Sequence, residues 1–177
     1  SSKNKKKFLF VSTKKQHSEI VENIAKETNN YFVNFRWLGG MITNWNTVKN
    51  SINTLNNYEN ILNTEDTVFT KKELSDIEKK KIRLDKTLGG IVEMKSTPDV
   101  IFIIDTNREH IAVLEAKKLG IPIIGIVDTN CDPDLIDYPI PANDDGVKSV
   151  QFILDNFKKV LVSSEDTSSA ESTTKNE

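Results

Sequence analysis

Short, uninterrupted apolar runs that alternate with amphipathic helical segments constrain the fold of this chain more than any other feature. Val100–Ile104 and Ile123–Val127 contain only apolar residues and one glycine, and a helical pattern with Ile111 and Leu114 lies between them. Phe8–Val11 is a similar run. Runs this short, without alternating polar residues, are typical of strands that are buried on both faces of a parallel sheet. The pattern therefore predicts an α/β fold with right-handed crossovers.

Two further strands and a disordered tail are predicted around this centre. Tyr31–Val33 follows a helical segment that extends to about Thr28. Tyr138–Pro141 contains two prolines, which cannot donate to a central ladder, so it is expected to be an edge strand. Residues 163–177 show no hydrophobic periodicity and are predicted to be disordered.

Three places match the capping-box pattern, in which a Thr hydroxyl and a Glu or Gln side chain satisfy free amides at a helix start. They are Thr13–Gln16, Thr70–Glu73 and Thr106–Glu109. We therefore expect a helix to begin at each of these places.

Residues 44–88 are predicted to form an antiparallel helical hairpin of the coiled-coil type. Two segments carry apolar residues at alternating three- and four-residue steps, and a short polar loop joins them. Glu59 interrupts the first apolar stripe and Lys81 the second. Because each stripe is narrow, the hairpin is expected to protrude from an α/β domain formed by residues 1–43 and 89–162.

Charge is distributed unevenly along the chain, although the formal net charge is only −2. Residues 1–49 carry nine Lys or Arg against three Asp or Glu, and residues 99–145 carry three against ten. Binding to phosphate depends on local cations, so an acidic total does not exclude RNA. The alternative is chance clustering of charges on a solvated surface.

The segment from Asn34 to Lys49 contains the features that best indicate RNA binding. Its residues offer cations for phosphates, planar rings for stacking, glycines for close approach, and a helix N-terminus for anions. The candidate RNA-binding residues are Lys14, Lys15, Arg36, Trp37, Gly39, Gly40, Asn44, Trp45 and Lys49. The alternative interpretation is that Trp37 and Trp45 pack the hairpin against the sheet, with the glycines as a hinge.

A catalytic or metal-dependent role has weaker support. Asp105 and Asp128 end two neighbouring predicted strands, where Mg²⁺ or Zn²⁺ could bind. No cofactor is expected to be required, because no phosphate-binding glycine motif is present and neither His17 nor His110 forms a recognisable triad. Cys131 is the only cysteine, and no apolar run reaches the roughly 18 residues of a membrane helix. Neither catalysis, membrane binding nor a homo-oligomer is expected.

The chain resembles the small-subunit ribosomal protein two family in its bacterial and organellar form. The segment from Arg36 to Trp45, Arg-Trp-Leu-Gly-Gly-Met-Ile-Thr-Asn-Trp, is similar to the signature of that family. Further matches occur in the family's order from about Lys7 to Phe157. They are residues 8–15, 88–91, 98–101, 119–123, 128–134 and 140–145.

The resemblance implies a flavodoxin-like parallel sheet with helices on both faces and a coiled-coil hairpin. It also implies a structural role in the small ribosomal subunit, with ribosomal RNA and neighbouring ribosomal proteins as partners, small-subunit protein one among them. The alternatives are a non-ribosomal protein-binding module and a nucleotide- or metal-binding α/β module. The ribosome of a plastid is the favoured location, with another organelle or the bacterial cytoplasm as alternatives.

The chain departs from the family's pattern before Lys7. Bacterial members carry an N-terminal region there, with a His-Phe-Gly-His segment and a strand. We therefore expect that the chain is a fragment or one piece of a split protein, and that its sheet could lack a strand.

Overall fold

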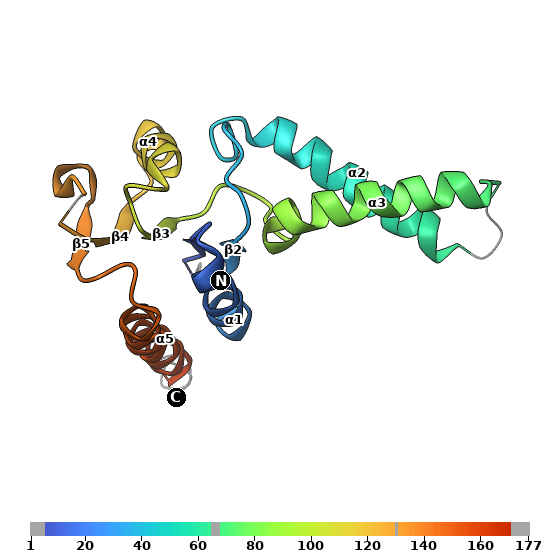
Figure 1. The fold of residues 1–177 in the computed structure, drawn as a ribbon. Coiled ribbons are helices and arrows are strands. Elements are labelled where there is room, and N and C mark those ends of the chain that lie inside the picture. The colour runs from blue at the N-terminus through green and yellow to red at the C-terminus, as the bar shows by residue number, and fades with distance from the viewer. Residues whose placement is uncertain (1–5, 65–67, 130, 171–177) are drawn as a thin grey trace.

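The computed structural model describes residues 6–64, 68–129 and 131–170, with side chains described up to residue 163. Its centre is a five-stranded, fully parallel sheet with the order β2-β1-β3-β4-β5 (Figure 1). The strands are β1 (Phe8–Val11), β2 (Tyr31–Val33), β3 (Val100–Ile104), β4 (Ile123–Val127) and β5 (Tyr138–Pro141). This order is that of flavodoxin-like sheets, so the predicted fold is confirmed. Within the described residues, the sheet has all five strands of that pattern.

The helices are α1 (Ser18–Glu27), α2 (Trp45–Asn63), α3 (Lys71–Leu88), α4 (His110–Leu119) and α5 (Val147–Ala170). Of these, α1 and α5 cover one face of the sheet and α4 covers the other. The short 3₁₀ helices are η1 (Lys15–His17), η2 (Gly89–Ile91) and η3 (Pro133–Leu135). In the described part of the chain, no helix combines the length and apolar character needed to cross a membrane.

The two faces of the sheet build two separate cores, because successive side chains of a strand point in opposite directions. Phe10 and Phe102 pack with α1 and α5 on one face. Leu9 and Ile101 point to the other face, where α4 and the segment after β2 cover them. Because both faces of β1, β3 and β4 are covered, these strands read as uninterrupted apolar runs.

The helices α2 and α3 run side by side in opposite directions and project from the α/β body (Figure 1). Val48, Ile52 and Leu55, near the start of α2, are buried, whereas the outer part of the hairpin is largely exposed. The hairpin is inserted between β2 and β3, as predicted. The two charges that interrupt its apolar seam form a pair, with Lys81 Nζ 3.1 Å from Glu59 Oε1.

Some predicted boundaries differ from the structure. Only Thr70–Glu73 forms a capping box, whereas the predictions at Thr13–Gln16 and Thr106–Glu109 are wrong. The helix α5 continues to Ala170, so it enters the segment for which disorder was predicted. The rest of that segment, residues 171–177, lies outside the described residues.

Candidate nucleic-acid interface

Residues 34–44, which we call the elbow, connect β2 to α2 and are held by one buried carboxylate of α4. Glu115, only 8% exposed, accepts hydrogen bonds through both oxygens. Oε1 accepts from Trp37 Nε1 at 3.1 Å and Gly40 N at 2.6 Å, and Oε2 accepts from Ile42 N, Thr43 N and Thr43 Oγ1 at 3.0–3.1 Å. The elbow is therefore folded around an internal anion.

The Glu115 carboxylate is stabilised in its charged form. Burial alone would raise its pKa, but the hydrogen bonds from Trp37 and the elbow amides outweigh burial and lower the pKa below the usual range. This carboxylate satisfies the amides just before α2, in the region where the sequence predicted a phosphate. Sequence reasoning missed Glu115, although a glutamate between the apolar Ala112 and Ala116 on one helix was a detectable signal.

The two tryptophans lie in different environments, and neither is a fully exposed ring. Trp37 is 8% exposed and belongs to the core on the α4 side of the sheet. Its ring is therefore not accessible for stacking with a base, and the alternative interpretation, packing of the elbow against the sheet, describes its position. Trp45 packs partly buried against the same core, and its Nε1 is buried without a hydrogen-bond partner within the described structure.

Lys14 is bound by three carboxylates of its own chain. Its Nζ lies 2.6 Å from Asp105, 2.9 Å from Asp144 and 2.7 Å from Asp145. Burial disfavours the ammonium, but the bonds to these carboxylates raise its pKa above the usual value. Lys14 joins the ends of β1 and β3 to the segment before α5, which does not fit the predicted contact with phosphate.

The remaining candidates are accessible or partly accessible. Lys15, Arg36 and Lys49 are exposed and have no ion-pair partner among the described residues. Asn44 is exposed at the start of α2, and its Oδ1 accepts from Thr47 Oγ1. Gly39 is exposed as well.

Gly40 is the elbow residue whose backbone requires glycine. Its φ is +87°, a conformation that residues with a Cβ rarely adopt, and an added Cβ would lie 3.3 Å from the Cβ of Asn44. Gly40 therefore shapes the elbow through its own backbone.

A row of cations on α3 was not singled out by the sequence reasoning. Lys72, Lys79, Arg83 and Lys86 are separated by seven, four and three residues, so they fall within an arc of about 60° on the helix. This arc is opposite the seam formed by Leu74, Ile77 and Leu84, which are partly buried. We call these four residues the cation stripe, and it extends over about 21 Å of helix.

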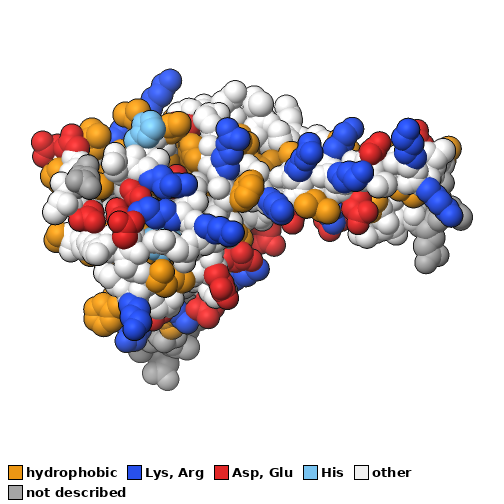
Figure 2. Space-filling view, in the orientation of Figure 1, with side chains coloured by type: hydrophobic (Ala, Val, Ile, Leu, Met, Phe, Trp, Pro, Cys, Tyr) orange, Lys and Arg blue, Asp and Glu red, His pale blue; other side chains and the backbone are white. Residues whose placement is uncertain are grey.

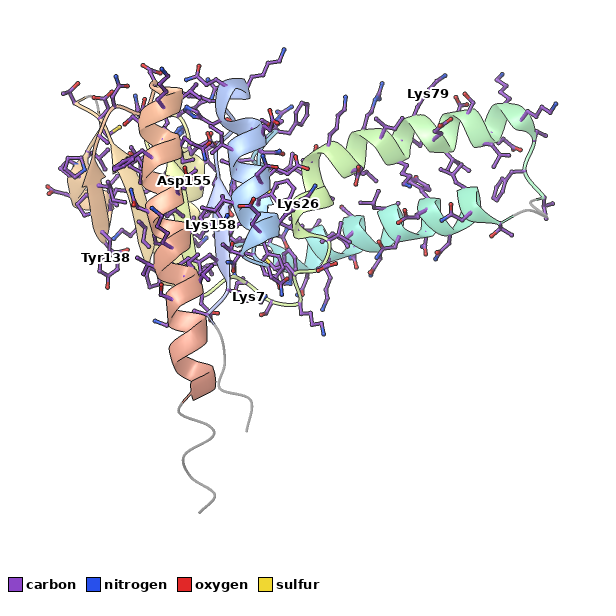
Figure 3. The ribbon with its side chains drawn as sticks, turned by 90° about the horizontal axis from the view of Figure 1, so that it is seen from below. Lys7, Lys26, Lys79, Tyr138, Asp155 and Lys158 are labelled. Atoms are coloured by element: carbon purple, nitrogen blue, oxygen red, sulfur yellow. The ribbon has the colours of Figure 1, made fainter. Side chains whose placement is uncertain are left out.

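The cation stripe is exposed to solvent. Its side chains are exposed, and Lys79 lies on the side of α3 that faces away from α2 (Figure 3). In the space-filling view, Lys and Arg side chains follow one another along the hairpin (Figure 2). Lys79 has a distant contact with Asp76, at 3.9 Å, whereas Lys72, Arg83 and Lys86 have no ion-pair partner in the described part of the chain.

The predicted metal ligands Asp105 and Asp128 do not form one donor set. Among the described residues, Asp105 lies with Cys131 and Asp144, whereas Asp128 lies with Asp144 and Asp145. The ammonium of Lys14 already balances the charge of Asp105, Asp144 and Asp145. Lys14 therefore already neutralises this cluster of carboxylates, and among the described residues no further feature indicates a metal ion there.

Comparison with known proteins gives a consistent result. The family described as ribosomal protein S2 matches residues 1–164. A relative named small ribosomal subunit protein uS2 from Wolbachia pipientis subsp. Culex pipiens is 62% identical over 145 residues, which cover 82% of this chain and 54% of the relative. The protein of the same name from Rhizobium leguminosarum bv. trifolii is 57% identical over 154 residues, which cover 87% of this chain and 60% of the relative.

A third relative with this name, from Mesorhizobium japonicum, is 51% identical over 154 residues. The matched residues cover 59% of the length of that relative. The chain thus spans little more than half the length of the relatives that it matches.

Proposed function

The chain belongs to the ribosomal protein S2 family, and on this premise we propose that it is a non-catalytic structural constituent of the small ribosomal subunit. In this role it binds ribosomal RNA and neighbouring ribosomal proteins during translation. The matching relatives carry the name of a small-subunit protein, and the resemblance extends through both the α/β body and the hairpin.

The observation that carries the proposal of RNA binding is the cation stripe. Its four cations are exposed, and three of them have no ion-pair partner among the described residues. Such a row suits a polyanion, because each ammonium or guanidinium that meets a phosphate releases condensed counterions. Lys15, Arg36 and Lys49 extend the proposed RNA surface to the elbow. Of the residues predicted from the sequence, Lys14 and Trp37 are better supported as internal supports of that surface than as contacts.

We propose that neighbouring proteins, with small-subunit protein one as a candidate, bind near the loop after β4, which carries Asp128, Asp132 and Asp134. Leu114 and Leu135 are 56% and 41% exposed, and both line a small pocket of about 160 Å³. Asp132 lies at the same pocket. The carboxylate repels phosphate, whereas the apolar pocket beside it suits a protein segment that carries apolar and basic side chains.

The proposed location is a ribosome of the bacterial type. The reported relatives are bacterial, so the plastid that the sequence favoured receives no support from them, whereas the bacterial cytoplasm is consistent with them. We further propose that residues 44–88 act as one arm of the coiled-coil type, on an α/β domain formed by residues 1–43 and 89–162.

The test is incorporation into small subunits that lack this protein. The wild-type chain is expected to co-sediment with such subunits, and Arg83→Glu combined with Lys86→Glu is expected to reduce the bound fraction about tenfold. Lys148→Glu combined with Lys159→Glu, which changes the charge equally on α5, is the matched control and is expected to bind normally. Equal incorporation of all three proteins contradicts the proposed RNA surface, and failure of the wild-type chain to bind contradicts the proposed function.

A further inference from the structure

Phe35 is an exposed aromatic residue in the elbow that the packing of the fold does not use. Its side chain is 56% exposed, whereas Trp37, two residues later, is buried in the core. It takes no part in the aromatic cluster formed by Phe8, Phe10, Phe102 and Phe157. A planar ring held at the surface offers a face for another flat group to stack on.

The ring of Phe35 lies at a groove on the outer side of the edge strand β2. The groove has a volume of about 700 Å³, and its walls come from α1, β2 and the last turns of α3. Gly89 and Gly90 also line it. A Cβ on Gly90 would lie 2.1 Å from the carbonyl oxygen of Phe32, so this part of the wall is formed by closely packed backbone. The groove therefore lies at the junction between body and hairpin.

The charges at the groove are partly neutralised and partly free. Lys26 forms an ion pair with Glu22 at 2.6 Å, and Asn34 donates its amide to Glu22 and to the Ser18 carbonyl. Lys15 and Lys86 line the same groove, are exposed, and have no ion-pair partner within the described ranges. Asp85 is the remaining carboxylate of the wall. The free cations thus come from two different elements, with the ring of Phe35 at the same groove.

We propose that this groove receives one unpaired nucleotide of an RNA chain, with its base stacked on Phe35 and its flanking phosphates near Lys15 and Lys86. The inference rests on the proposed function and names the kind of RNA that the site selects. A paired base has both faces covered by its neighbours, so only a bulged or looped nucleotide can enter a groove and stack on a side chain. Because the amide of Asn34 is already bonded, recognition relies on stacking and charge and tolerates different bases.

The test compares two RNA hairpins that differ by one bulged nucleotide. The full chain is expected to bind the bulged hairpin about tenfold more tightly than the fully paired one. Phe35→Ala is expected to abolish this preference, and Phe35→Trp is expected to retain it. Phe152→Ala removes a ring that is 70% exposed on α5 and serves as the matched control, which is expected to behave as wild type.

Photocrosslinking gives a second readout that does not depend on affinity. A 5-iodouracil at the bulged position is expected to crosslink to the peptide that contains Phe35. If the wild-type chain binds both hairpins equally with a steep salt dependence, and the crosslink maps elsewhere, the nucleotide site is wrong while the proposed function stands. If neither hairpin nor ribosomal RNA binds with a salt dependence, the proposed function itself fails.

Discussion

The indole Nε1 of Trp37 donates to Glu115 Oε1 over 3.1 Å, and this bond joins the elbow to the middle of α4. The same carboxylate also accepts hydrogen bonds from backbone amides of the elbow and from the Thr43 hydroxyl. A single side chain of the α/β body therefore ties down the elbow where the chain leaves the sheet to form the hairpin. The position of the proposed RNA surface relative to the body depends on this contact.

Glu115→Gln is expected to lower the free energy of unfolding by about 3 kcal/mol at pH 7. The glutamine side chain has one acceptor oxygen in place of two, and its NH₂ group would face N–H donors of the elbow. Buried backbone amides of the elbow would therefore lose their hydrogen-bond acceptor. The pKa of Glu115 is lowered in the folded protein, so the carboxylate stabilises the fold above its unfolded pKa and this stabilisation is lost as the pH falls. Urea unfolding between pH 7 and pH 3 is therefore expected to depend less on pH in the variant.

The control for this prediction is Glu19→Gln, which changes an exposed glutamate of α1. We expect it to leave both the stability at pH 7 and its pH dependence nearly unchanged. A Glu115→Gln protein with the stability and pH profile of wild type contradicts the role of Glu115 as an anchor.

Lys14→Met is expected to lower the free energy of unfolding by about 3 kcal/mol at neutral pH, because it leaves Asp105, Asp144 and Asp145 without their shared cation. The pKa of Lys14 is raised, so its stabilisation is fully present below its unfolded pKa of 10.5 and is lost only as the pH rises through the folded pKa. Urea unfolding of the variant and of wild type at pH 7 measures this loss.

Lys15→Met is the matched change at the next residue and separates stability from RNA binding. Lys15 is exposed, so the variant is expected to keep the stability of wild type. Its RNA affinity is expected to depend less steeply on salt, by about 0.7–0.9 in the slope of log K against log salt. Lys14→Met is expected to keep the wild-type slope, and a reduced slope there shows that Lys14 contacts phosphate after all.

The pair Lys81–Glu59 is expected to contribute less than about 1 kcal/mol to stability. Lys81 is 29% and Glu59 52% exposed at the side chain, so solvent screens their attraction. A double-mutant cycle with Lys81→Ala and Glu59→Ala, read by urea unfolding, measures this coupling. A coupling of 2 kcal/mol or more indicates that the pair acts as a structural lock in the hairpin and contradicts this expectation.

The order of strands and helices was predictable from the sequence. A strand that is buried on both faces is apolar throughout, and a helix that packs along one seam shows apolar residues at three- and four-residue steps. The contacts between distant residues were not predictable in this way. Thr13 and Glu109 each matched a local capping pattern, yet the amide and hydroxyl of Thr13 donate to the carboxylate of Glu109. A local motif yields to a tertiary partner when the fold brings that partner within bonding distance.

The candidate site was predictable as a segment, but the roles of its residues were not. Trp37 and Phe35 are both aromatic, and the sequence alone favours the larger ring as a stacking platform. In the structure, Trp37 points to Glu115 and the core, whereas Phe35 remains exposed. Similarly, Lys14 and Lys15 are adjacent cations, but only Lys14 is brought to three carboxylates. Which neighbour faces inward depends on how the segment that carries it is held, the elbow for Phe35 and Trp37 and the turn after β1 for Lys14 and Lys15.

The adjacent glycines Gly39 and Gly40 are expected to respond differently to a methyl group. Gly40→Ala is expected to lower the free energy of unfolding by about 1–2 kcal/mol, since its φ of +87° strains any residue with a Cβ. A Cβ on Gly39 would meet nothing within 4 Å, and its φ is not in the left-handed region, so Gly39→Ala is expected to be neutral in urea unfolding. RNA affinity then tests the close approach predicted for Gly39. If RNA contacts the elbow backbone there, Gly39→Ala weakens binding without a loss of stability, and unchanged affinity limits the RNA surface to the side chains around it.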